Sequence, residues 1–150
     1  MNFFDALTHN TVLVSAVLGW FIAQILKTLI HLFFTRKFVA ERLVGSGGMP
    51  SSHSSTVCAL ATSVAIQQGP DSAAFAISLV VAIIVMHDAM GVRRETGIQA
   101  RVLNEMMKLF EDMGSDMPAQ DKLKEFVGHT PLQVLIGAVL GILTALIINL

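Results

Sequence analysis

The sequence lacks a second cysteine, a sizeable net charge and any internal repeat. Cys58 stands alone in an apolar segment, which excludes an internal disulfide and a cysteine-rich metal site. The formal net charge of −1 provides no global field for nucleic acid, so no nucleic-acid partner is expected. The first ten residues carry no lysine or arginine, and no small-residue cleavage site closes the first apolar run. We therefore expect a retained helix there rather than a signal peptide, within a single domain over residues 1–150.

Apolar residues are abundant and are gathered in runs. They make up 53% of the chain, and the mean hydropathy is +0.66, whereas soluble domains are about 45–50% apolar. A bilayer core about 30 Å thick is crossed by about 20 helical residues. Residues 11–34, residues 72–86 with their flanks, and residues 131–150 supply such runs.

A fourth apolar run, residues 54–68, is shorter and rich in serine, threonine and alanine. It is expected to cross the bilayer only when packed among the other helices or entered from a re-entrant loop. The sequence therefore predicts an all-α integral membrane bundle of about four transmembrane helices. A soluble helical protein is disfavoured, because too few polar residues flank residues 136–150 for a solvated helix.

The basic residues predict the orientation of these helices. Apart from Lys27, they lie after the first run or between the third run and the last one: Arg36, Lys37, Arg42, Arg93, Arg94, Arg101, Lys108, Lys122 and Lys124. Basic loops stay in the cytoplasm. Both termini are therefore expected outside, and both basic loops inside.

The second basic loop, residues 91–128, contains an amphipathic pattern. Val102, Leu103, Met106, Met107 and Phe110 recur at helical spacing. This pattern predicts a cytoplasmic helix that either extends the third membrane helix or lies at the interface. Residues 114–120 are expected to form a turn, and residues 121–127 a short helix that ends at a glycine.

Two histidines are expected at helix N-termini on the cytoplasmic side. A glycine-rich stretch that includes Gly48 lets the backbone approach a ligand, and Ser51 or Ser52 can cap the helix whose first turn holds His53. His129 precedes Thr130-Pro131, where proline suits the start of a helix. Helix N-termini favour anions. The alternatives are a flexible hairpin with a helix cap, and histidines that make only structural bonds.

Cations near these ends add to the case for an anion site. Arg93 and Arg94 follow the third membrane helix, and a guanidinium matches phosphate oxygens in two-point geometry. The alternatives are simple anchoring at the membrane surface and a neutralising pair between Asp88 and one arginine. Within the first run, Lys27 is the best candidate for a buried functional charge; Gln24 and His31 share its helix face.

A metal site is not expected. His53, His87 and Asp88 are the residues that suggest one, but they do not follow any regular ligand spacing.

Two motifs resemble those of the type 2 phosphatidic acid phosphatases, relatives of the vanadium haloperoxidases. Pro50-Ser51-Ser52-His53 resembles their P-S-G-H motif, and the segment from His129 to Val134, followed by Gly137 and Gly141, resembles their last motif. The string from Gly47 to His53, with Asp88, Gly91-Val92-Arg93-Arg94 and Gly97, is similar to a divergent branch of small bacterial and plastid membrane proteins. The resemblance covers essentially the whole chain and implies a bacterial inner-membrane location.

The resemblance implies roles for individual residues. His129 takes the place of the nucleophile that receives the phosphoryl group, and His53 that of the residue that protonates the leaving oxygen. Gln133 stands where an acid orients the nucleophile. The position of the superfamily's arginine is Leu123 here, so Arg93 or Arg94 is expected to replace it. Lys27 and Arg36 fit the lysine–arginine motif loosely, and with Gly48, Ser51 and Ser52 they complete the expected phosphate-binding set, while Asp88 is expected to orient.

The expected activity is metal-independent, cofactor-free hydrolysis of a phosphomonoester or diphosphate on a lipid of the cytoplasmic leaflet, such as phosphatidylglycerol phosphate or phosphatidic acid. The alternative is a catalytically weak or inactive phospholipid-binding or assembly protein, and a transporter of a phosphorylated metabolite is a weaker one. Small residues on the last run (Gly137, Gly141 and Ala145) suggest a homodimer.

Overall fold

The structure, a computed structural model, describes residues 2–36, 38, 45, 47–113, 123 and 128–150. The regular elements of these residues are all helices: α1 (Phe3–Thr8), α2 (Thr11–Thr35), α3 (Ser52–Gln68), α4 (Ala73–Met90), α5 (Val92–Asp112) and α6 (Pro131–Ile148). The prediction of an all-α chain is confirmed. The turn and short helix predicted for residues 114–127 lie outside the described residues, apart from Leu123.

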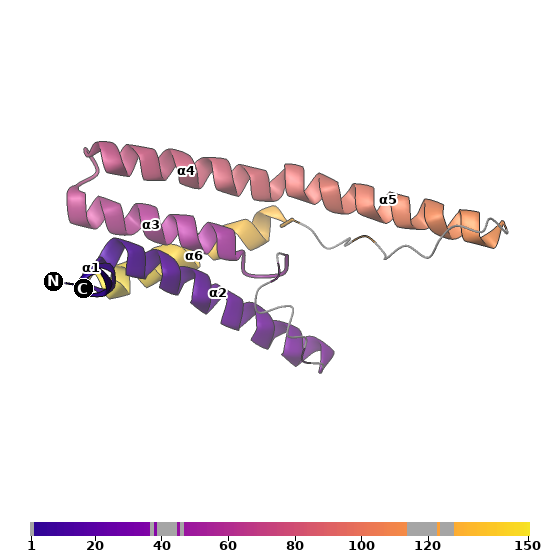
Figure 1. Ribbon diagram of the computed structural model, residues 1–150, viewed down its shortest axis with the longest axis horizontal. Helices are drawn as coiled ribbons and strands as arrows, with labels where there is room; N and C mark the ends of the chain where they lie inside the picture. Colours follow the sequence, from indigo (N-terminus) through magenta and orange to yellow (C-terminus); the bar gives the residue numbers. More distant parts are fainter. Residues whose placement is uncertain (1, 37, 39–44, 46, 114–122, 124–127) are drawn as a thin grey trace.

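Four helices form the bundle, and α3 is its centre. Helix α3 packs against α2, α4 and α6, and it contributes nine buried residues. Helices α2 and α6 and the continuous run Ala73–Phe110 are long and apolar enough to cross a membrane. With only 17 residues, α3 is shorter, and its many hydroxyl side chains are enclosed by its neighbours. The structure therefore shows the membrane bundle that the sequence predicted, with α3, the helix of the fourth apolar run, enclosed by its neighbours (Figure 1).

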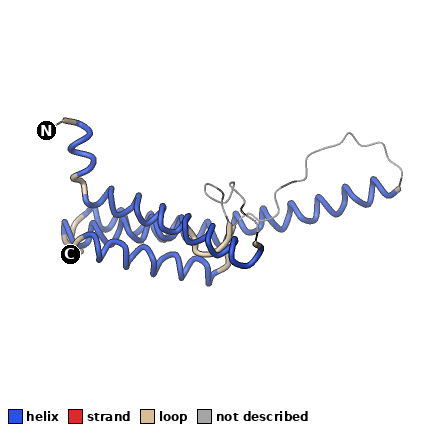
Figure 2. Tube along the Cα trace, turned by 90° about the horizontal axis from the view of Figure 1, so that it is seen from below, coloured by secondary structure: helices blue, strands red, loops and turns tan. Residues whose placement is uncertain are grey.

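Both termini lie at one end of the bundle, and α3 and α6 begin at the other end (Figure 1). The short helix α1 turns away from the bundle before α2 begins (Figure 2). Side-chain caps fix where the long helices start. Asn10, Ser51 and Ser72 each accept a hydrogen bond from the backbone N–H three residues on, at 3.0, 3.3 and 3.1 Å, which satisfies a donor that the first helical turn leaves free.

Small residues allow α3 to lie very close to α6. A Cβ on Gly137 would strike the carbonyl oxygen of Ser51, and a Cβ on Gly141 would strike that of Ser55. Ala145, one turn further on, is fully buried. Gly137, Gly141 and Ala145, the small residues that suggested a homodimer, thus pack within one chain. The homodimer stays a prediction without their support.

Helix α5 continues α4 beyond the bundle after a break at Gly91 (Figure 1). The predicted extension of the third membrane helix is therefore present. The apolar side chains of α5 are largely exposed, among them those of Met106 and Phe110. The side-chain amide of Asn104 bonds both the N–H and the carbonyl of Leu123, each at 3.0 Å.

Candidate active site

The starts of α3 and α6 are bonded to each other, and this brings the two predicted histidines together. The N–H of Ser51 donates to the carbonyl of Gln133 at 3.1 Å. The rings of His53 and His129 consequently face each other edge to face, with centroids 5.8 Å apart and an interplanar angle of 64°. The sequence placed each histidine at a helix N-terminus, and the structure places both in one site.

The end of α4 fixes the position of His129. The N–H of His129 donates to the carbonyl of Ala89 at 2.9 Å. Gly128 has a φ of +92°, and a Cβ there would strike the backbone of Arg93 and Arg94. Only glycine tolerates both this conformation and this close approach. The first turn of α5 is therefore held directly against the residue that precedes His129.

His129 is buried, and its ring nitrogens are left without hydrogen-bond partners among the described residues. The side chain is 1% exposed, and neither Nδ1 nor Nε2 makes a hydrogen bond; Nδ1 of His53 is in the same state. A buried polar atom without a partner costs about 1–3 kcal/mol, and such atoms require an explanation. Two facing imidazoles with three such nitrogens form a site suited to a polar ligand.

Burial, more than any charge, lowers the pKa of His129 from 6.5 to about 4. The positive charge of Lys27 is the second cause, and His53 adds a smaller effect in the same direction. The Gln133 side chain and the Gly48 backbone oppose the shift, but neither meets the ring at hydrogen-bond geometry. His129 is therefore a neutral imidazole at physiological pH, the form that has a nitrogen lone pair available.

Lys27 reaches this site from inside α2. Its side chain is 2% exposed. Its Nζ donates to Oε1 of Gln24 at 2.7 Å, to the carbonyl of Gly45 at 3.3 Å, and to Oγ of Ser52 at 3.5 Å. The ammonium group therefore lies at the first turn of α3, next to His53.

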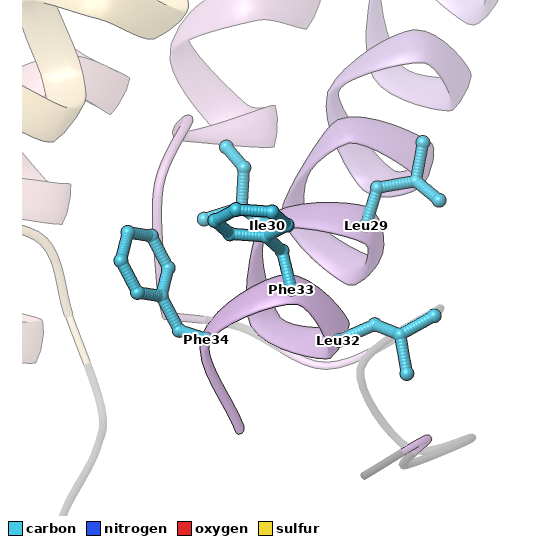
Figure 3. Close-up of a pocket in the computed structure, with 5 residues that line it drawn as sticks. All are labelled: Leu29, Ile30, Leu32, Phe33 and Phe34. Atoms are coloured by element: carbon cyan, nitrogen blue, oxygen red, sulfur yellow. The ribbon is translucent and has the colours of Figure 1, made fainter. Parts of the chain in front are cut away.

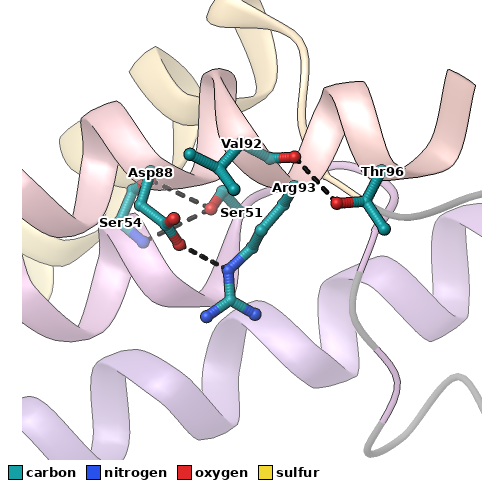
Figure 4. A network of polar contacts seen from close by, with 6 residues as sticks. All are labelled: Ser51, Ser54, Asp88, Val92, Arg93 and Thr96. Carbon is teal, nitrogen blue, oxygen red and sulfur yellow. Dashed lines mark hydrogen bonds and ion pairs between the residues drawn. The ribbon is translucent and has the colours of Figure 1, made fainter. Parts of the chain in front are cut away.

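The predicted arginines lie at the edge of the site. Nε of Arg93 pairs with a carboxylate oxygen of Asp88 at 2.6 Å, and both side chains are partly exposed (Figure 4). The neutralising pair considered from the sequence is thus formed. The side chain of Arg94 is exposed. Arg36, also exposed, directly follows the end of α2 and lies nine positions beyond Lys27, about 13 Å along the helix. The structure thus brings Lys27 to the histidines and leaves Arg36 away from them.

The predicted serine and glycine ligands have separate positions. Ser51 is fully buried, and its Oγ accepts from both the N–H and the hydroxyl of Ser54, at 3.3 and 2.9 Å (Figure 4). Ser52 contacts Lys27, as described above. Gly48 has a φ of +84°, and its backbone lies near the His129 ring. Of the two serines, Ser52 is the one whose hydroxyl faces the cation.

Gln133 has a structural bond that the sequence analysis missed. Its Oε1 accepts from the N–H of Thr130 at 3.0 Å, while its own N–H donates to Oγ1 of Thr130 at 3.4 Å. This is a capping box, whose signature is a serine or threonine followed three residues later by glutamate or glutamine. Thr130 and Gln133 show this signature in the sequence. The orienting role of Gln133 stays a prediction.

The residues that suggested a metal site, His53, His87 and Asp88, do not form a group of ligands within the described part of the chain. His87 is exposed, and the carboxylate of Asp88 is paired with Arg93. Within the described part of the chain, no three histidine, cysteine or acidic side chains are grouped as metal ligands.

An open apolar groove lies on the last turns of α2, beyond Lys27. It has a volume of about 500 Å³ and is lined by Leu29, Ile30, Leu32, Phe33 and Phe34 (Figure 3). Ile30 and Phe34 lie three and seven positions after Lys27, which places them on the same face of the helix. Two of the five lining residues thus share the helix face of the buried cation.

Comparison with known proteins agrees with the motifs. Residues 8–144 match the family described as "Divergent PAP2 family". The uncharacterized membrane protein YuiD of Bacillus subtilis (strain 168) is 40% identical over 151 residues, which cover 95% of this chain and 96% of that protein. No solved structure matches the chain. The chain belongs to the divergent PAP2 family of membrane proteins.

Proposed function

We propose that the protein is a membrane lipid phosphatase that works through a phosphohistidine on His129. The observation that carries this proposal is the state of His129: it is buried and neutral, and both of its ring nitrogens lack hydrogen-bond partners among the described residues. Such a ring has a free lone pair for attack on phosphorus. His53 and the Lys27 ammonium lie beside it, as a proton donor and an anion-binding group require.

The reaction proceeds in two steps. A ring nitrogen of His129 attacks phosphorus, and the bond between phosphorus and the lipid oxygen breaks. His53, in its protonated form, gives a proton to that departing oxygen. Water then gives a proton back to His53 and attacks the phosphohistidine. The bond between phosphorus and His129 breaks, inorganic phosphate leaves, and both histidines are restored. Lys27 and the free N–H groups at the start of α3 stabilise the charge on the phosphoryl oxygens.

The expected substrate is a lipid phosphomonoester or diphosphate in the cytoplasmic leaflet. The site lies at the end of the bundle away from both termini (Figure 1), and the positive-inside rule assigns that end to the cytoplasm. The apolar groove on the last turns of α2, beyond Lys27, offers a surface for hydrocarbon (Figure 3). Phosphatidylglycerol phosphate and phosphatidic acid have the required chemistry, and the inner membrane of a bacterium is the expected location.

A second candidate is a phospholipid-binding or assembly protein that retains the anion site without turnover. The position of Gln133 favours it. An amide cannot stabilise an imidazolium by charge as a carboxylate does, and Oε1 of Gln133 is already bonded to Thr130.

Phosphate release from a panel of lipid phosphates separates the two candidates. The purified protein should release phosphate from at least one lipid, with EDTA having no effect, and His129→Gln should abolish release. His87→Gln is the matched control, because it removes an exposed histidine outside the site. Lipid binding that His129→Gln reduces, without release from any lipid, would favour the binding protein. Release that persists in His129→Gln would contradict the proposed nucleophile.

A further inference from the structure

Gln24 is buried in the middle of a membrane helix, where an amide needs a specific partner. Its side chain is 4% exposed, within α2. Burying an amide in an apolar environment is costly unless it is hydrogen-bonded, and polar side chains at membrane depth usually face a functional cavity. The partner here is Lys27, one turn further on, whose Nζ lies 2.7 Å from Oε1 of Gln24.

The bond to Gln24 is shorter than two others that the ammonium makes to described residues. The other acceptors are the Gly45 carbonyl at 3.3 Å and Oγ of Ser52 at 3.5 Å, which come from the loop before α3 and from the start of α3. A lysine side chain has about 2 kcal/mol of rotamer entropy to lose when it is fixed. Because Gln24 and Lys27 lie on the same helix, α2 fixes the position of Gln24. The bond from Gln24 then directs the Lys27 side chain toward the loop and α3.

The geometry points to Gln24 as a positioning residue, which holds the ammonium of Lys27 at the first turn of α3 and so raises the affinity of the site for a phosphoryl group. This inference rests on the proposed role of Lys27 in binding phosphate. Because the acceptor on Gln24 is an amide oxygen, it leaves the positive charge of Lys27 in place. A neutral oxygen directs the ammonium without opposing its charge, whereas a carboxylate at the same distance would form an ion pair and weaken its attraction for an anion.

Binding of orthovanadate to the purified protein in detergent tests this inference without requiring turnover. Gln24→Leu keeps a similar volume and removes the acceptor, and it should weaken vanadate binding about tenfold, the effect of one hydrogen bond to a charged group. Gln24→Glu keeps an acceptor and adds a negative charge, and it should also weaken binding. Gln99→Leu, at an exposed glutamine on α5, is the matched control and should bind as the parent does.

A double-mutant cycle with Lys27→Met separates positioning from a general structural role. If Gln24 acts through Lys27, Gln24→Leu should produce no further loss once Lys27 is methionine. An equal loss in both backgrounds would overturn the inference, as would parent-like vanadate affinity in Gln24→Leu.

Failure of this inference is distinguishable from failure of the proposed function. A parent protein that binds vanadate but releases phosphate from no lipid would overturn the proposed phosphatase activity. The double-mutant cycle would still decide whether Gln24 positions Lys27. Parent-like vanadate binding in Gln24→Leu, together with normal lipid hydrolysis, would overturn only the positioning role of Gln24. A parent that binds no vanadate would overturn the inference, and a parent that also releases phosphate from no lipid would overturn both.

Discussion

The N–H of Ser51 donates a hydrogen bond to the carbonyl of Gln133 across 3.1 Å, and this bond joins two helices whose starts are some 80 residues apart in sequence. Because Ser51 lies two positions before His53 and Gln133 lies four positions after His129, the bond also sets the spacing of the two histidines. The proximity of α3 and α6 is therefore as important to the site as the histidines themselves.

A substitution that separates these two helices should damage the site. In Gly137→Ala the new Cβ would strike the Ser51 carbonyl, and overpacking of this kind typically costs about 1–3 kcal/mol. We expect a lower thermal unfolding temperature in detergent and reduced phosphate release. Val139→Ala, on the exposed face of α6, is the control. Unchanged stability and turnover in Gly137→Ala would show that the close approach is not needed.

The pKa of His129 predicts how stability and turnover depend on pH. The pKa is lowered to about 4 from 6.5, so between these values the unfolded chain binds a proton that the folded chain does not. Stability should therefore fall as the pH drops from 6.5 toward 4, by at most about 1.4 kcal/mol per pH unit from this group. In His129→Gln this contribution should be absent. The same pKa keeps the nucleophile neutral, so loss of turnover near pH 6.5 through protonation of His129 would contradict it.

Gln133→Glu tests the least usual residue of the site. Glutamate suits the same capping-box position, so the helix start should be preserved, and a carboxylate near His129 would stabilise its charged form. We expect turnover to be retained or raised. Gln133→Leu removes the bond that Oε1 accepts from the Thr130 N–H but keeps the Thr130 cap, and it measures the structural part of the effect. If Gln133→Glu abolished turnover while the fold was retained, Gln133 would not occupy the orienting position.

The orientation of the bundle can be measured by thiol labelling in intact cells. With Cys58 replaced by alanine, a cysteine at Asp71 should react with an impermeant reagent added outside. A cysteine at Asp112 should be shielded until the cells are opened. The reverse pattern would place the histidines outside and would remove the cytoplasmic leaflet as the source of substrate.

The membrane helices and the histidine positions could be predicted from the sequence because they depend on local patterns. Residues 11–34 and 131–150 were apolar runs of sufficient length, and the structure has helices at 11–35 and 131–148. Ser51 was a recognisable cap. His53 and His129 could be placed at helix N-termini because capping is decided within about four residues.

The contacts between distant segments could not be predicted in the same way. That Gly137 packs on Ser51, and that Lys27 reaches Ser52, depends on how separate helices meet. The helical spacing of Gln24 and Lys27 was visible, but it did not show that the two side chains are bonded. The partner of Asp88 was open in the sequence, and the structure selects Arg93.

The central claim is that His129 carries the phosphoryl group. Its most direct test is to mix the purified protein with a lipid that bears a radiolabelled phosphate, to stop the reaction during turnover, and to locate the label. Label should appear on the peptide that contains His129, should be lost in mild acid and retained in alkali as a phosphohistidine is, and should be absent in His129→Gln. Phosphate release without any labelled protein, or label that persists in His129→Gln, would contradict the claim.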